Sequence, residues 1–303
     1  MIDWKTPELL SYRKLPVLVT GSTGFIGNRL IEVLNILDAN ITQIARRQQK
    51  NDPRVLKCDL SDYEACQTLI QSKSFKIIFH AAGWVSSDIS MGNVNKANKN
   101  NVIATLNLLE AATNAAKSPK IVIPGSILEN SDIKNPYTVS KSAASLYADL
   151  YSSNYNADIS KLMICLTYGP HQKLNSLVPY TINSLNIARG PIKLKLNRYL
   201  DILFVDDLIH ALLKAGLAMK PVKPIYIGTN QLLTVKDITT LIAELMGKDP
   251  NLIEFESDDC KYETILKPKH LEDAKTSLDW TPNWSLSQGL EKTIDWYVNE
   301  GQI

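Results

Sequence analysis

Short runs of hydrophobic residues alternate with longer segments of helical periodicity along the first half of the chain. The runs at 17–20, 41–44, 55–58, 77–80, 121–124 and 162–166 are apolar and rich in β-branched residues, which is typical of buried strands. Between them, residues 25–37 and 94–116 and the segment after Pro136 place apolar residues at helical spacing. Buried strands joined by crossover helices predict an α/β fold with a doubly wound parallel sheet of the Rossmann type.

The regular alternation of strands and helices loosens after the segment 168–170, where a second region is expected to begin. We predict a dinucleotide-binding Rossmann domain at residues 15–170 plus about 198–229. A smaller α/β substrate-binding lobe on the carboxyl side is predicted at about 171–197 plus 230–303.

Composition narrows the classes of function. The 303 residues include 33 Lys and Arg against 31 Asp and Glu, so the basic excess that nucleic-acid binding requires is missing. No apolar run approaches the roughly 20 residues that span a bilayer, and the amino terminus is polar. The four cysteines have neither metal-ligand nor disulfide spacing. We therefore expect a cytoplasmic protein without a metal site and with neither nucleic acid nor membrane as a partner.

A glycine-rich loop joins the first expected strand to the first helix. Gly21, Gly24 and Gly27 give the spacing G-x-x-G-x-x-G, a variant of the dinucleotide-binding turn. In such a turn the glycines permit a tight bend, a close approach of the pyrophosphate and close packing of helix and strand, while the helix N-terminus attracts the phosphates. The expected cofactor-binding residues of this loop are Gly21, Thr23, Gly24, Phe25, Ile26 and Gly27.

The end of the second strand indicates which dinucleotide is bound. NAD-specific sites usually have an acidic residue here that binds the adenosine ribose, but this chain has Arg46 and Arg47 and no acid between residues 41 and 49. Guanidinium groups suit a 2′-phosphate, so NADP(H) is favoured and NAD(H) remains possible. The alternative is a basic loop that is merely solvated.

Residues after the third and fourth strands complete the expected cofactor site. Asp59 and Leu60 are placed to receive the adenine amino group, although Asp59 is also suited to cap the following helix. The small residues Ala81, Ala82 and Gly83 allow the backbone to pass close to the cofactor. We expect the neighbouring His80 to be a packed residue at the strand end and not a catalyst.

A tyrosine and a lysine four residues apart supply candidate chemistry. Tyr137 and Lys141 share one helical face, and a nearby ammonium brings a phenol closer to the working range of an acid–base group. Lys141 is also suited to hold the nicotinamide ribose. Ser126, just after the fifth strand, is placed to hydrogen-bond the substrate oxygen that Tyr137 protonates.

Taken together, these motifs resemble the extended short-chain dehydrogenase/reductase superfamily, in its nucleotide-sugar epimerase, dehydratase and reductase branch. The residues that carry the resemblance are 20–27, 80–83, Asn101 with Val102, Ser126, Tyr137, Lys141, 168–170, 204–207, 226–228 and the carboxyl-terminal segment 278–297.

The resemblance implies an NAD(P)-dependent enzyme with Ser126, Tyr137 and Lys141 as catalytic triad and a nucleotide-sugar substrate. It further implies that Asn101 supports the active site from its helix. His171 and Arg198 are candidate substrate contacts in the carboxyl-side lobe, with solvated surface residues as the alternative. By analogy the chain is expected to form a homodimer through the helices at about 94–116 and 137–155.

The residues after Ser126 depart from the pattern of the dehydratases. Those relatives have two acidic groups directly after this hydroxyl, whereas this chain has Ile127 and Leu128, which transfer no protons. Glu129 is one residue further on, and we expect it to point elsewhere. Only ten residues separate Ser126 from Tyr137, a shorter substrate-covering loop than most nucleotide-sugar members have.

The remaining groups suffice to move a hydride to or from a carbonyl carbon. We therefore expect NADPH-dependent reduction of a nucleotide-linked 4-keto-6-deoxyhexose, in deoxysugar biosynthesis, with Tyr137 as proton donor. An NAD-dependent nucleotide-sugar 4-epimerase needs the same triad and is the main alternative. A non-catalytic NADP-binding protein is the third hypothesis, and the intact triad argues against it.

Overall fold

A computed structural model describes residues 2–47, 52–86, 88–131, 134–187, 190–194, 197–221, 224–256, 260–261 and 269–300. The chain forms two compact units. The sheet unit comprises Asp3–Ile164 and Ile209–Tyr226, and the carboxyl-side unit comprises Cys165–Leu208 and Ile227–Ile303 with the first two residues. The domain boundaries given above stay a prediction.

The sheet unit is built on a seven-stranded sheet with the order β10-β6-β5-β4-β1-β2-β3, and every pairing from β3 to β6 is parallel. The predicted doubly wound parallel sheet is therefore confirmed. Its strands are β1 (Pro16–Thr20), β2 (Asn40–Ala45), β3 (Val55–Lys57), β4 (Ile77–His80), β5 (Lys120–Ser126), β6 (Ile159–Ile164) and β10 (Ile225–Ile227).

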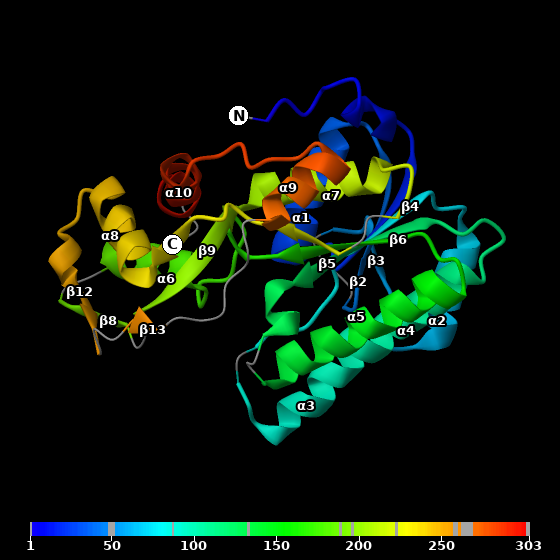
Figure 1. Ribbon diagram of the computed structural model, residues 1–303, viewed down its shortest axis with the longest axis horizontal. Coiled ribbons are helices and arrows are strands. Elements are labelled where there is room, and N and C mark those ends of the chain that lie inside the picture. The colour runs from blue at the N-terminus through cyan, green and yellow to red at the C-terminus, as the bar shows by residue number, and fades with distance from the viewer. Residues whose placement is uncertain are drawn as a thin grey trace. The chain divides into compact units, whose positions relative to one another are not determined.

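Helices cover both faces of this sheet. In Figure 1, α2, α4 and α5 lie on one side of the strands, and α1 and α7 lie on the other. The helical elements are η1 (Leu9–Tyr12), α1 (Phe25–Ile36), α2 (Tyr63–Ser72), α3 (Met91–Ala97), η2 (Asn98–Ile103), α4 (Ala104–Thr113), η3 (Ile127–Asn130), α5 (Pro136–Asn154) and α7 (Val205–Leu217).

The hydrophobic core explains why the strands lack an alternating pattern. All four residues of β4 and all six of β6 are buried, because a parallel sheet is covered on both faces. One core cluster joins Leu18 and Ile78 of the sheet to Leu69 of α2 and Leu108 of α4. The short apolar runs of the sequence therefore become strands that are buried on both faces.

The helix expected at 94–116 is interrupted. Its middle, η2, is a π-helical turn that contains Asn101 and Val102, and regular α-helix flanks it as α3 and α4. A π-turn inserts one extra residue into the hydrogen-bond ladder and is frequent at functional sites. Apolar periodicity does not reveal such an insertion, because the overall helical path continues through it.

The carboxyl-side unit combines small sheets and helices. In it β9 pairs with β7, β11 and β13, while β8 pairs with β12. Its elements are β7 (Leu166–Tyr168), α6 (Leu177–Ile187), β8 (Ile192–Leu194), β9 (Asn197–Phe204), β11 (Leu232–Thr234), α8 (Val235–Leu245), η4 (Pro250–Leu252), β12 (Ile253–Phe255), β13 (Cys260–Lys261), α9 (Lys269–Leu278), α10 (Leu286–Ile294) and η5 (Asp295–Asn299).

Candidate active site

The glycine loop forms a tight turn between β1 and α1. Gly21 has a φ of +65°, and a Cβ there would lie 2.7 Å from the backbone of Ala82. A Cβ on Gly27 would lie 2.2 Å from the Gly21 carbonyl oxygen. Both positions therefore require glycine, one for its backbone conformation and one for the close packing of helix on loop.

The first turn of α1 fits a pyrophosphate. Gly24 is the N-cap residue and has no side chain to cap the helix, and the first main-chain bond of the helix runs from Asn28 N–H to the Gly24 carbonyl at 2.8 Å. The amides of residues 25–27 precede that bond. A Cβ on Gly24 would meet only the Gly21 carbonyl oxygen, at 3.2 Å, so the approach to these amides is open. Free amides and the helix dipole together favour an anionic group at this place.

The two arginines lie where β2 ends, and both are exposed. Arg46 donates a hydrogen bond to Asn100 Oδ1. Burial works against ionisation of Asp59, but hydrogen bonds from Ser61 and the charges of Lys99 and Arg46 bring its pKa below its ordinary value. Positive charge thus gathers at this corner of the sheet.

Asp59 does not cap the helix that follows it. Its Oδ1 accepts from the amide and the hydroxyl of Ser61, at 3.0 and 2.7 Å. The N-cap of α2 is Asp62, whose carboxylate accepts from Ala65 N–H. Leu60 is buried, and its carbonyl accepts from the Asn107 side chain at 2.9 Å.

The segment after β4 is held from two sides. Ala82 N–H donates to Thr20 Oγ1 at 3.0 Å, which joins this segment to β1. Buried Asn101 accepts from Trp84 N–H at 2.6 Å and donates to the Trp84 carbonyl at 3.0 Å and to Ser140 Oγ at 2.8 Å. Asn101 therefore joins the segment 81–84, which includes Ala81 and Gly83, to helix α5.

His80 is packed at the strand end, as its position in the sequence indicates. Its Nδ1 lies 2.9 Å from Thr20 Oγ1 and its Nε2 lies 2.9 Å from Thr105 Oγ1. Burial and the nearby charge of Lys141 lower its pKa to about 3. The ring is therefore neutral at physiological pH and serves as a link between β1, β4 and α4.

Helix α5 carries the candidate acid–base groups in its first two turns. Asn135 and Thr138 form a reciprocal capping box, and Pro136 occupies the first turn, so the start of the helix is well defined. This start sets the position of Tyr137 beside the end of β5, where the side chains of Tyr137 and Ser126 share a hydrogen bond. Lys141 follows one turn later and donates from Nζ to the Pro124 carbonyl at 2.9 Å.

The environment of these groups sets their protonation. Burial raises the pKa of the Tyr137 phenol, the hydrogen bond with Ser126 lowers it, and the charge of Glu129 raises it; the net shift is upward. Burial lowers the pKa of Lys141, and Glu129 opposes that effect. Tyr137 is thus a protonated phenol at neutral pH and is able to donate a proton.

Glu129 turns back toward the end of β5. Its carboxylate is buried, accepts from Ser126 N–H at 2.8 Å and lies 3.9 Å from Lys141 Nζ. Ser145 of α5 also donates to it. The signal that sequence reasoning missed is the spacing Ser126-x-x-Glu129, a capping box that starts the short helix η3 and turns the glutamate back toward the strand end.

The two candidate substrate contacts, His171 and Arg198, belong to the carboxyl-side unit. His171 has a φ of +67°, and its ring lies 4.6 Å from that of Trp296. Arg198 lies on β9 opposite Lys261 of β13. The geometry of that unit by itself assigns neither residue a ligand.

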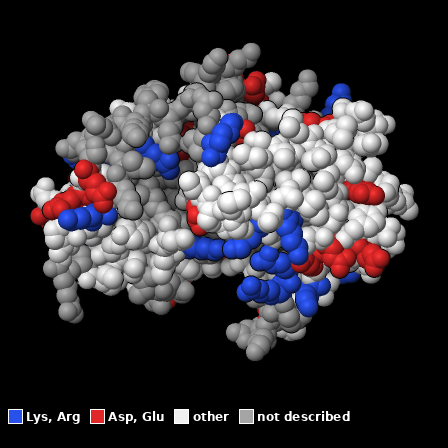
Figure 2. All heavy atoms as spheres, turned by 90° about the horizontal axis from the view of Figure 1, so that it is seen from below, with Lys and Arg blue, Asp and Glu red and all other residues white. Residues whose placement is uncertain are grey.

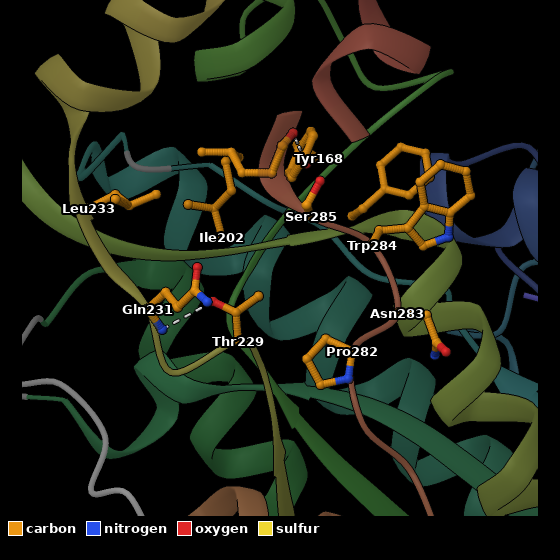
Figure 3. Close-up of a pocket in the computed structure, with 11 residues that line it drawn as sticks. Tyr168, Ile202, Thr229, Gln231, Leu233, Pro282, Asn283, Trp284 and Ser285 are labelled. Carbon is orange, nitrogen blue, oxygen red and sulfur yellow. Dashed lines mark hydrogen bonds between the residues drawn. The ribbon is translucent and has the colours of Figure 1, made fainter. Parts of the chain in front are cut away.

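The carboxyl-side unit also holds a cavity of about 250 Å³. Figure 3 shows Thr229 and Gln231 on one side of it and Pro282 and Trp284 on the other. The carboxylate of Asp207 accepts from the amides of Asn283 and Trp284, at 2.7 and 3.1 Å, and so holds this wall in place. Burial raises the pKa of Asp207 to about 6 in spite of these hydrogen bonds.

Within the described part of the chain, no helix is long and apolar enough to cross a membrane. The same residues contain no group of three or more histidine, cysteine or acidic side chains arranged to hold a metal ion.

Known proteins share this architecture over nearly the whole chain. A dTDP-glucose 4,6-dehydratase of Haemophilus influenzae is 25% identical, with 93% of this chain and 97% of that protein covered. A CDP-abequose synthase of Salmonella typhimurium is 24% identical, with 94% and 99% covered. The solved structure of a UDP-glucose 4-epimerase from Thermotoga maritima superposes with a TM-score of 0.81 at 22% identity, covering 94% of this chain and 99% of that one.

The model of the NAD dependent epimerase/dehydratase family matches residues 17–228. That range is most of the chain, and it includes the glycine loop and the cluster of Ser126, Tyr137 and Lys141. The chain therefore belongs to the NAD dependent epimerase/dehydratase family.

Proposed function

We propose that this protein is an NADPH-dependent reductase that acts on a nucleotide-linked 4-keto-6-deoxyhexose. The observation that carries the proposal is the partly buried Tyr137 phenol, which shares a hydrogen bond with Ser126 and has a raised pKa. A protonated phenol beside a second hydroxyl suits the protonation of a ketone oxygen, which is what reduction to an alcohol requires.

Each residue of the cluster has one task in this reaction. Ser126 donates a hydrogen bond to the ketone oxygen and orients the carbonyl group. Tyr137 transfers its proton to that oxygen as the carbon is reduced, and Lys141 assists the return of a proton to Tyr137. A bound NADPH supplies the hydride, and the amides of residues 25–27 with Gly24 suit its pyrophosphate.

The residues after Ser126 favour reduction over dehydration. Elimination of water needs an additional acid and base close to the sugar, and Ile127 and Leu128 provide neither. The carboxylate of Glu129 is buried and is engaged by Ser126 N–H and by Ser145. The remaining groups, Ser126, Tyr137 and Lys141, are the minimum that hydride transfer to a ketone needs.

The relatives support the substrate class. Their names include dTDP-glucose 4,6-dehydratase, CDP-abequose synthase and a trifunctional UDP-glucose 4,6-dehydratase, 3,5-epimerase and reductase, of which this chain matches 48%. We extend a nucleotide-sugar substrate to this chain, with His171 and Arg198 as proposed contacts for it.

A 4-epimerase is the second candidate. It needs the same three side chains, and solved epimerases share the fold, among them a UDP-glucuronic acid 4-epimerase of Bacillus cereus in complex with NAD, at a TM-score of 0.77. An epimerase oxidises and re-reduces its substrate, so it retains its dinucleotide and consumes none.

A turnover assay distinguishes the two. The purified protein is first denatured and its supernatant tested for released dinucleotide. It is then given NADPH and a 4-keto-6-deoxyhexose linked to dTDP, UDP or CDP, while absorbance at 340 nm is followed. We expect substrate-dependent loss of NADPH and a C4 alcohol by NMR. Retained NAD together with no loss of NADPH contradicts the reductase and favours the epimerase.

We also propose that the protein is a homodimer through the surface formed by η2 and α5. Large apolar side chains are exposed there, with Leu146 at 70% and Val139 at 53%. Figure 2 looks onto this side of the sheet unit and shows a broad uncharged area bordered by charged side chains. Exposed apolar patches of this kind mark interaction sites.

The dimer proposal predicts the effect of Leu146→Glu. A carboxylate buried in an apolar interface loses its hydration without gaining a partner, so light scattering is expected to give the mass of a monomer. Ile36→Glu is the matched control, since Ile36 is 46% exposed on α1, on the opposite side of the sheet. A wild-type protein that is itself monomeric contradicts the proposal.

A further inference from the structure

Glu129 is a buried acidic residue beside the candidate active site. It is a buried carboxylate between the end of β5 and the second and third turns of α5, and its side chain is 3% exposed. Burial of a carboxylate is unfavourable unless hydrogen bonds and opposite charges compensate for the lost hydration. The groups that compensate here are also the groups of the candidate active site.

Three contacts hold the carboxylate. Oε1 accepts from Ser126 N–H at 2.8 Å and lies 3.9 Å from Lys141 Nζ. The hydroxyl of Ser145 donates to Oε2. The main chain of Glu129 is held as well, because Ser142 Oγ donates to its carbonyl at 2.7 Å.

The strand beside the carboxylate leaves room for it. A Cβ on Gly125 would lie 3.2 Å from Glu129 Oε1 and 3.1 Å from the sulfur of Met163. Both distances are tighter than ordinary contact. A side chain at this position of β5 would therefore press on the carboxylate from the strand side.

Among the described residues, two further titratable groups lie near this pair. Lys161 on β6 donates to Asp149 at 2.8 Å and to the Ser145 carbonyl at 3.2 Å, and its charge lowers the pKa of Lys141. His80 on β4 is neutral at physiological pH, since its pKa is lowered to about 3. The charges that remain closest to one another are those of Glu129 and Lys141.

We propose that Glu129 is a positioning residue of the active site, whose carboxylate fixes the main chain at Ser126 and keeps Lys141 in its charged form. This proposal rests on the proposed roles of Ser126, Tyr137 and Lys141. Glu129 itself touches no reacting atom. It acts through the ammonium of Lys141 and through the end of β5, which carries Ser126.

The sign of its electrostatic effect is the same for both neighbours. A negative charge nearby favours retention of a proton, so Glu129 raises the pKa of Lys141 and that of Tyr137. Removal of the negative charge therefore lowers the pH at which each of the two groups loses its proton.

Glu129→Gln tests this role, because it keeps the shape and an acceptor for Ser126 N–H and removes the charge. We expect the alkaline limb of the pH profile of kcat/KM for ketone reduction to move down by about one pH unit. Glu110→Gln, the same change at an exposed position of α4, is the matched control and leaves the limb in place. An unmoved limb in a folded Glu129→Gln protein overturns the proposal, even if kcat falls at every pH.

Ser145→Ala is a second variant that tests the same proposal if Glu129→Gln does not fold. It retains the charge and removes a donor that partly neutralises it, so the limb is expected to move slightly upward. A purely structural carboxylate predicts no movement, and that result overturns the proposal.

Titration of the ¹³Cζ signal of Tyr137 separates this proposal from the proposed function. The signal is assigned with Tyr137→Phe and followed with pH in the complex with oxidised dinucleotide, which requires no turnover. If the protein reduces no 4-keto sugar, a lower titration point in Glu129→Gln still supports the role of Glu129. An identical titration point in wild type and variant contradicts it.

Discussion

Replacement of Tyr137 by Phe is expected to reduce kcat about a thousandfold while the affinity for NADPH stays nearly the same. The phenol is the proposed proton donor, and a positioned acid–base group contributes typically 10²–10⁴ to the rate. The side chain is partly buried, and Phe keeps the packing of the ring while it loses the hydroxyl and the hydrogen bond with Ser126. Steady-state kinetics gives kcat, and quenching or enhancement of NADPH fluorescence gives the dissociation constant.

The control for this variant lies at the other end of the same helix. Tyr155 follows the last turn of α5 and is 56% exposed, so Tyr155→Phe removes a hydroxyl without approaching the site. It is expected to leave both constants unchanged. If Tyr137→Phe retains a tenth or more of the wild-type kcat, another group donates the proton and the assignment fails.

The double replacement of Arg46 and Arg47 by Ala is expected to weaken NADPH binding by about tenfold to a hundredfold. Hydrogen bonds to a charged group contribute about 1.5–3 kcal/mol each, and about 1.4 kcal/mol corresponds to a factor of ten. NADH lacks the 2′-phosphate, so its affinity is expected to change little. The side chains are exposed at the end of β2, so their replacement is expected to leave the fold intact.

Arg54→Ala is the matched control for the arginine pair. Arg54 is exposed between β2 and β3, and its guanidinium is bound to Asp52 at 2.8 Å. Its removal is expected to leave the preference for NADPH intact. Equal affinity of the wild-type protein for NADPH and NADH contradicts the role of the arginines and moves the epimerase to first place.

Local patterns in the sequence predicted the larger part of the fold. The buried strands and the glycine loop are recognisable because their chemistry lies within a few adjacent residues. The proximity of Ser126 and Tyr137 was also predictable. Ser126 lies at the end of a strand and Tyr137 lies at the start of the following long helix, and both positions are at the carboxyl edge of a parallel sheet. The pairing of Tyr137 with Lys141 follows from helical spacing alone.

Other features depend on contacts between residues far apart in the chain. Asn101 reaches Trp84 and Ser140 only because a π-turn rotates it toward them. His80 is neutral because the fold buries its ring and brings the charge of Lys141 close to it.

Glu129 is the clearest example of a residue whose position the sequence does not determine and the tertiary structure does. The sequence by itself determined the parallel sheet, the turn that suits a pyrophosphate and the presence of a serine, a tyrosine and a lysine on one edge, because strand runs, glycine spacing and helical spacing are local patterns. The direction of Glu129 was decided by the capping box of η3, the space above Gly125 and the hydroxyl of Ser145. A buried charge lies where donors from several elements converge, and that convergence exists only in the folded protein.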